Sequence, residues 1–344
     1  MIHIPDTIEI NDDIRRLTSV VCHSLSDVPD IIDTWNEGKV ADVEGYYENA
    51  KINRVYVDRV HVKKAFAEYT AAYNADDPKI KLKIDHTYRV AALCERIAKA
   101  AGMCAYDVEL AWLSGMLHDV GRFEQIKRYN TFSDADSVDH AKFGADLLFK
   151  DGLISTFLKG MVKCTGYKPG ALEDRYDSDG VFLYDRLNKS DMEMLELAIR
   201  CHNMYRIPQG LNSREQAFCN VLRDADKVDI FKVNIDTPLE EIYNTTTEEL
   251  MKSNITDEVL EAFDEEHCIL KAIRRTPADT VIGHVSLAYE LVYDESVRIT
   301  VEQGYLAKLM HFHSDNEETN RKMAMVREKM DSYVKKRIGR KMHR

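Results

Sequence analysis

The chain has 344 residues, of which 44% are hydrophobic and 31% charged, and this composition excludes a disordered or fibrous protein. Its formal net charge of −12 argues against an extended surface for nucleic acid or anionic lipid, although a local group of Arg and Lys could bind a small phosphorylated molecule. The sequence predicts neither a membrane span nor a secretory signal, and its seven cysteines are odd in number without CxxC pairs. We therefore expect a cytoplasmic protein in a reducing compartment, with no membrane partner.

The order of elements along the chain predicts an all-α fold, because helical periodicity recurs and β-leaning pieces such as residues 181–187 are too few for a sheet. Residues 1–78 are expected to form an N-terminal extension and a leading helix, residues 79–235 a helical core, and residues 236–344 a C-terminal helical region packed on that core. Residues 165–189 are interpreted as either a lid or a plain surface insertion. The predicted helices cover residues 60–74, 82–101, 106–118, 139–150, 190–203, 213–232, 284–311 and 317–338.

Four of the twelve histidines lie at the end of a predicted helix and project towards a core. His86 and His140 open an apolar stripe, His202 closes one, and His118 lies next to a stripe of leucines. Helix ends are places where side chains from several helices converge in a bundle. We therefore expect these four imidazoles to meet at one point.

The pair His118-Asp119 interrupts an apolar helix, and burying such a pair costs several kcal/mol unless something compensates. A metal ion is one compensation, and ordinary hydrogen-bond partners are the other. Gly115 lies one turn before the pair, so its missing side chain leaves room for an ion or for a neighbouring helix. Both alternatives stay open at this point.

Three aspartates crowd the helix predicted over residues 213–232. Asp226 lies beside the apolar stripe and is the best candidate for an inward carboxylate, whereas Asp224 and Asp229 are expected to be solvated. Imidazole nitrogens and carboxylate oxygens without a thiolate suit Mn, Fe, Zn, Co or Ni, or Mg if the carboxylates dominate. Cys201, next to His202, is expected to be a buried neighbour and not a ligand.

Three segments in order carry a family resemblance: "HTYRVAALCERIA" from His86, "MLHDVGRF" around His118-Asp119, and "LRDADKVD" with Asp226. Together they resemble the HD-domain superfamily of metal-dependent phosphohydrolases, over roughly residues 79–235. The resemblance implies an all-helical catalytic core and a metal ion held by these four residues.

Two further segments, "DHAKFGADLL" with His140 and "AIRCHNMYRIPQGL" with His202, resemble the dinuclear members of that superfamily. By that resemblance a second ion is bound by His140, His202 and a bridging Asp119. The chain also resembles the HD-GYP branch, but it has Cys201-His202 in place of a double histidine and lacks the GYP tripeptide. These departures argue against a third metal and against a cyclic dinucleotide substrate.

The resemblance implies hydrolysis of a phosphomonoester or phosphodiester, most simply a nucleotide, by attack of a metal-activated water. Asp119, Arg122 and Lys142 are the predicted catalytic residues, since both cations follow a ligand closely and could reach the rim of the site. Two alternatives remain: a diiron oxygenase of the same superfamily, which uses the same order of ligands, and a non-catalytic nucleotide-binding protein. The oxygenases typically place a Lys where this chain has Arg122, which favours the hydrolase.

Overall fold

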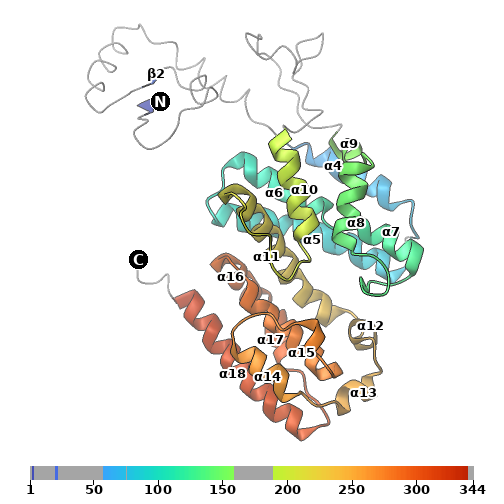
Figure 1. Cartoon of the computed structure of the whole chain (residues 1–344), viewed down its shortest axis with the longest axis vertical. Helices are drawn as coiled ribbons and strands as arrows, with labels where there is room; N and C mark the ends of the chain where they lie inside the picture. The colour runs from blue at the N-terminus through green and yellow to red at the C-terminus, as the bar shows by residue number, and fades with distance from the viewer. Residues whose placement is uncertain (1, 4–19, 22–56, 75, 159–188, 340–344) are drawn as a thin grey trace. The chain divides into compact units, whose positions relative to one another are not determined.

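The computed structural model describes residues 2–3, 20–21, 57–74, 76–158 and 189–339 (Figure 1). Apart from β1 (Ile2–His3) and β2 (Val20–Val21), which pair in parallel, the regular elements of these residues are helices, so the predicted all-α fold is confirmed. In chain order the helical elements, of which η2 is a π-helix and η4 and η5 are 3₁₀ helices, are α4 (Arg59–Thr70), α5 (Pro78–Ala100), α6 (Ala105–Leu117), α7 (Val120–Tyr129), α8 (His140–Ala145), η2 (Asp146–Lys150), α9 (Ile154–Leu158), α10 (Lys189–Cys201), α11 (Ser213–Asp236), α12 (Leu239–Tyr243), α13 (Thr247–Lys252), α14 (Asp257–Asp264), η4 (Lys271–Ile273), α15 (Pro277–Val285), η5 (Ser286–Glu290), α16 (Asp294–Gln303), α17 (Tyr305–Met310) and α18 (Glu317–Gly339).

Helices α4 to α18 belong to one compact unit, which contains Arg59–Lys159 and Leu187–Arg344. A second unit, Met1–Asp58 with Gly160–Arg186, falls almost wholly outside the described residues, and so does the segment 165–189 that the sequence marked as a lid or an insertion. Among the described residues, no helix combines the length and the apolar character needed to cross a bilayer.

Helices α5 and α6 form the centre of the core. Helix α5 begins at Pro78 because Asp77 caps it, accepting a hydrogen bond from the Lys79 backbone N–H. All residues of α6 from Val108 to Leu117 except Glu109 are buried, so this part of the helix is enclosed on every side. A Cβ atom at Gly115 would lie 2.6 Å from the Cα atom of Ala91 in α5. Gly115 therefore makes room for the neighbouring helix α5 and not for an ion.

Helix α11 connects the core to the C-terminal helices. Its N-terminus is fixed by a capping box between Asn212 and Glu215. The helix packs against α5, α6 and α10 and also against α16 and α17 (Figure 1). Buried side chains from Phe231 to Met330 form a hydrophobic cluster around the C-terminal helices. One helix thus joins the side chains of the core to those of the C-terminal region.

Two of the predicted helices differ from the structure. The helix predicted over residues 284–311 is wrong, since the chain there forms the end of α15, then η5, α16 and α17. The break before α16 arises because the backbone N–H groups of Val292 and Tyr293 donate to the buried carboxylate of Asp224. Gly304, with φ of 71°, separates α16 from α17. The helix predicted over 139–150 becomes α8 followed by a π-helical turn.

Candidate metal centre

Four histidine side chains converge within the helical core. His86 comes from α5, His118 follows α6, His140 begins α8 and His202 follows α10. None of the four is more than 5% exposed. The Nε2 atoms of His86 and His118 lie 3.3 Å apart, and those of His140 and His202 lie 3.1 Å apart. The structure therefore brings together the imidazoles that the sequence singled out.

Carboxylates fix the outward-facing nitrogen of two of these rings. Nδ1 of His86 lies 2.6 Å from Oδ2 of Asp229, and Nδ1 of His140 lies 2.7 Å from Oδ2 of Asp134. Asp229 also accepts two hydrogen bonds from the guanidinium group of Arg89, and it is 1% exposed. The expectation that Asp229 is solvated is therefore wrong: its buried carboxylate orients a histidine.

Backbone carbonyls do the same for the other two rings. Nδ1 of His118 donates to the carbonyl oxygen of Gly115 at 2.8 Å, and Nδ1 of His202 donates to that of Ile199 at 2.7 Å. Carbonyl and carboxylate oxygens only accept hydrogen bonds, so each Nδ1 carries the proton. In the neutral form each ring therefore presents the lone pair of Nε2 to the centre of the cluster.

The carboxylate of Asp119 lies between the two pairs of histidines. Its Oδ2 atom is 3.5 Å from Nε2 of both His86 and His118. Its Oδ1 atom is 3.5 Å from Nε2 of His140 and 3.8 Å from Nε2 of His202. Each oxygen of this one carboxylate thus faces one pair of imidazoles.

Negative charge at the centre is only partly balanced by the protein. Oδ2 of Asp119 accepts a hydrogen bond from Nζ of Lys83 at 2.7 Å, but Oδ1 is buried without a hydrogen-bond partner. Burial alone would raise the pKa of Asp119, yet Lys83 and His118 hold that pKa well below its usual range. Oδ1 of Asp226 lies 3.2 Å from Nε2 of His86, and this contact likewise lowers the pKa of Asp226 against the effect of burial. An unpartnered buried oxygen facing lone pairs calls for a cation.

The spacing of these atoms suits a metal ion. Two atoms that each bond one ion at about 2.1 Å lie about 3.0–3.4 Å apart in octahedral or tetrahedral geometry. The observed 3.3 Å and 3.1 Å between Nε2 atoms agree with this range. Two of the groups that could hold an ion share one carboxylate: His86 with His118 and Asp119, and Asp119 with His140 and His202. Neither group includes a sulfur atom.

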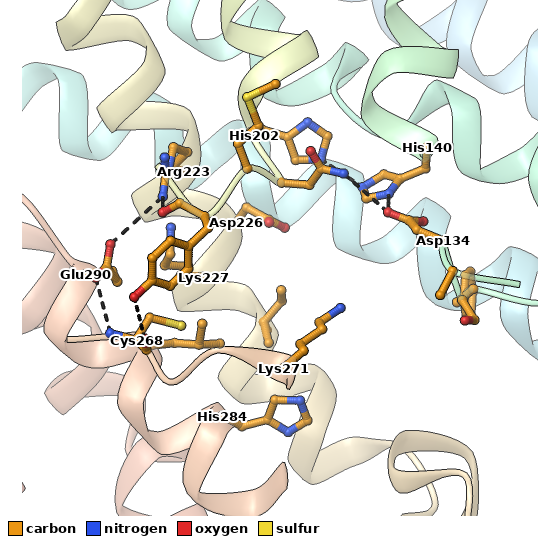
Figure 2. Close-up of a pocket in the computed structure, with 18 of the residues that line it drawn as sticks. Asp134, His140, His202, Arg223, Asp226, Lys227, Cys268, Lys271, His284 and Glu290 are labelled. Atoms are coloured by element: carbon orange, nitrogen blue, oxygen red, sulfur yellow. Dashed lines mark hydrogen bonds and ion pairs between the residues drawn. The ribbon is translucent and has the colours of Figure 1, made fainter. Parts of the chain in front are cut away.

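A cavity of about 710 Å³ opens beside the cluster (Figure 2). Asp119, His140, His202 and Asp226 line one side of it. The opposite wall includes residues 268–272 and helix α15, which belong to the C-terminal region. Six cationic side chains also line the cavity: Lys83, Arg122, Arg223, Lys227, Lys271 and Arg274.

The profile of the HD domain family matches residues 84–233, which lie within the predicted core and include all six ligand candidates. These residues form an HD domain. No curated protein and no solved structure gives a significant match to the chain. The resemblance to HD domains is therefore confirmed at the level of the family. Clustered His and Asp side chains in this domain could bind metal ions.

The predicted catalytic cations occupy different places in the HD domain. Arg122 lines the cavity, where its Nη1 atom donates to the Phe132 carbonyl and to Asp134, and its Nε lies 3.8 Å from Oδ1 of Asp119. Lys142 does not line the cavity. Its side chain is 54% exposed and pairs with Asp139 at 2.9 Å. Lys142 follows His140 by two positions on α8, and side chains at that spacing point about 200° apart.

Asp224, the other aspartate expected to be solvated, is 1% exposed. Its carboxylate accepts hydrogen bonds from the backbone of Val292 and Tyr293 and from the hydroxyl group of Ser296 at 2.7 Å. Burial raises the pKa of Asp224. The expectation that Asp224 is solvated is therefore wrong. Its buried carboxylate ties the HD domain to the segment before α16.

Three charged residues that support the cluster were missed in the sequence. Lys83 lies one helical turn before His86, and Asp229 lies one turn after Asp226, so helical spacing carried a signal for both. Asp134 lies in the loop before α8, where no periodicity could mark it. Each acts by orienting or charge-balancing a ligand candidate.

A contact between two glycines brings the helix after Asp119 against the helix that begins at His140. A Cβ atom at Gly121 would lie 2.7 Å from the backbone nitrogen of Gly144 and 2.9 Å from its Cα atom. Helices α7 and α8 therefore touch backbone to backbone at this point. The contact allows His140 to approach Asp119.

Proposed function

We propose that the HD domain hydrolyses a phosphomonoester or phosphodiester of a small molecule, with a nucleotide as the substrate class. One observation carries the proposal: a cluster able to bind metal forms one side of a cavity that six cationic side chains also line. The volume of about 710 Å³ falls in the range of small-molecule sites. Positive charge around a buried site stabilises the charge that develops on a reacting phosphate.

The proposal assigns two divalent ions to the cluster. His86, His118, Asp119 and Asp226 would hold one, and the second would be bound by His140, His202 and the same Asp119. Ions held there would neutralise phosphate charge and lower the pKa of a water molecule. Two oxygens of one buried carboxylate facing two imidazole pairs support this arrangement.

Two cations have defined positions in this scheme. Lys83 holds Oδ2 of Asp119 at 2.7 Å, which keeps that carboxylate ionised and oriented. Arg122 is fixed by Asp134 at 2.9 Å and is 13% exposed, so its guanidinium group is held beside the cavity. We assign Arg122 to binding a phosphate oxygen and Lys83 to positioning the bridging carboxylate.

The test is phosphate release by the full chain, metal-depleted and then reconstituted with Mn, Mg, Fe, Ni, Co or Zn. Substrates are nucleoside mono- and triphosphates, cyclic nucleotides and sugar phosphates. Cyclic and other diesters also need product analysis by chromatography, because their first cleavage releases no inorganic phosphate. We expect hydrolysis that depends on added metal.

A matched pair of variants locates the activity. Arg122→Gln should lower kcat/KM by about 10²- to 10³-fold, the usual effect of losing one preorganised donor. Arg128→Gln changes a 51% exposed arginine on the same helix and should leave kcat/KM unchanged. Metal-dependent oxygen uptake with ferrous iron and no hydrolysis would favour the oxygenase instead. Nucleotide binding without turnover under any metal would leave a binding protein.

A further inference from the structure

The cations that line the cavity differ in whether a nearby carboxylate balances their charge. Lys83 pairs with Asp119 at 2.7 Å and Arg122 pairs with Asp134 at 2.9 Å. Both lie near the metal cluster, and both have their charge balanced by a carboxylate. These two cations therefore belong to the machinery already described.

Three other cations form no ion pair with a carboxylate among the described residues: Lys227, Lys271 and Arg274. The carboxylates of Asp224, Asp226 and Glu290 attract Lys227 only from farther away. Lys227 is 9% exposed, and the Nε atom of Arg274 is buried without a hydrogen-bond partner. The remaining cation, Arg223, lies 4.0 Å from Glu290, the carboxylate that also accepts from the backbone of Cys268. Buried charges are normally paired, so Lys227 and the buried Nε atom of Arg274 point to an absent anion, and the exposed Lys271 adds positive charge beside them.

The backbone is shaped around the guanidinium group of Arg274. A Cβ atom at Gly283 in α15 would lie 2.7 Å from Nη1 of Arg274 and closer still to Nε. One donor of this guanidinium binds the carbonyl oxygen of Ile269 at 2.6 Å, which holds the group in place. The cation is therefore positioned by the fold and is not a mobile surface charge.

A neutral imidazole lies beside these cations. His284 lines the cavity, and its Nδ1 atom is buried without a hydrogen-bond partner. Burial, together with the charges of Arg274 and Lys271, lowers the pKa of His284 to about 3. At neutral pH the ring has an N–H group that can donate to an anion. Figure 2 shows His140 and His202 on one side of the cavity and Lys271 and His284 on the other.

We propose that Lys227, Lys271, Arg274 and His284 form a second anion site, and that the substrate is an organic bisphosphate whose two phosphates lie at separate ends of the molecule. One phosphate meets the metal cluster, and the other is held by this far wall. The substrate assignment rests on the proposed function, whereas the anion site itself does not. A monophosphate would leave the far wall unpaired.

The test compares two probes that differ by one phosphate, adenosine 3′,5′-bisphosphate and adenosine 5′-monophosphate. Their dissociation constants for the full chain are measured by calorimetry, with and without Mn²⁺. We expect the bisphosphate to bind at least about tenfold more tightly, because hydrogen bonds to charged groups are the strong ones. Without metal the bisphosphate should bind more weakly but still measurably, since the far wall contains no ligand of the cluster.

Variants locate the second site. Arg274→Gln and Lys271→Gln should each reduce bisphosphate affinity about tenfold and leave monophosphate affinity unchanged. Arg275→Gln changes a neighbouring arginine that is 65% exposed, and it should affect neither. Gly283→Ala keeps every charge but displaces the guanidinium group, so it should also weaken the bisphosphate alone. Lys271 is exposed at the start of η4, so its variant is expected to fold whatever happens to the others.

Equal affinity for the two probes, or equal losses for both in Arg274→Gln and Lys271→Gln, would overturn the second anion site. Phosphate release measured on the same samples keeps the two proposals apart. Tight bisphosphate binding without hydrolysis under any metal refutes the hydrolase and leaves the anion site. Hydrolysis of both probes with equal affinity refutes the anion site and leaves the hydrolase.

Discussion

The two halves of the histidine cluster differ in their access to the cavity. We call His86 and His118 the inner pair and His140 and His202 the outer pair. The outer pair lines the cavity, whereas the side chains of the inner pair are not part of its lining. An enclosed pair of histidines and a pair open to the cavity therefore lie side by side, with the carboxylate of Asp119 between them.

The support behind each pair differs in the same sense. Asp229, which orients His86, is 1% exposed and is held by Arg89. Asp134, which orients His140, is 28% exposed and lies at the cavity. We expect an ion at the inner pair to be held tightly, and an ion at the outer pair to exchange more readily and to meet the substrate first.

The largest expected effect comes from the residue that the two halves share. Asp119→Ala removes one ligand from each position together with the shared negative charge, so both ions should be lost. Metal content per chain, measured by mass spectrometry at one fixed free-metal concentration, checks this. One ion retained at full occupancy would show that Asp119 does not bridge.

The next largest effect is expected when one histidine of either pair is removed. His202→Ala should deplete the outer ion and leave the inner one, which keeps His86, His118, Asp119 and Asp226. His118→Ala should lower the content of the inner ion, and with it total metal, because the tighter position is damaged. The same metal analysis compares the two variants. Equal residual metal with equal affinity would erase the distinction between the halves.

A smaller effect is expected from the carboxylates behind the rings. Asp134→Asn should weaken the outer ion by about 10- to 100-fold, the usual range for partners that orient a ligand. Asp229→Asn should weaken the inner ion to a similar degree, and it also leaves Arg89 without its carboxylate. Competition with a chelator of known affinity gives both constants. If Asp134→Asn weakened the inner ion instead, Asp134 would not be the carboxylate that supports the outer pair.

The smallest effect is expected from Cys201. The side chain is 2% exposed, and burial raises the pKa of its thiol, so it behaves as a small apolar group. Cys201→Ala should retain all metal and lower the free energy of unfolding by about 1 kcal/mol. Denaturant titration and metal analysis of one sample give both values. Loss of an ion in this variant would identify sulfur as a ligand.

The convergence of the ligand candidates could be predicted because each lies on, or directly beside, the buried face of a helix, and helical periodicity reports burial. The partners that complete the site could not, because periodicity says nothing about what a buried face meets. Asp229 contacts His86 across 143 residues of chain, and Lys83 contacts Asp119 across 36. For the same reason, periodicity could not predict that Asp224 binds the backbone of Val292 and so interrupts the helix expected over residues 284–311. Lys142 lies outside the cavity lining because nearness in sequence to His140 does not imply nearness in space to the cluster.

The backbone contact between Gly121 and Gly144 bears on which ion the protein selects. Ligand bonds to Zn²⁺ are about 2.0–2.1 Å long and those to Ca²⁺ about 2.3–2.6 Å, so ions are distinguished by a few tenths of an ångström. A side chain at Gly121 would meet the backbone of Gly144 at 2.7 Å, so α7 and α8 would have to separate by more than that margin. His140 would then move away from Asp119, and the outer position would widen to fit a larger ion. In the proposed dinuclear site, the preferred ionic radius would thus be set in part by two residues that have no side chain.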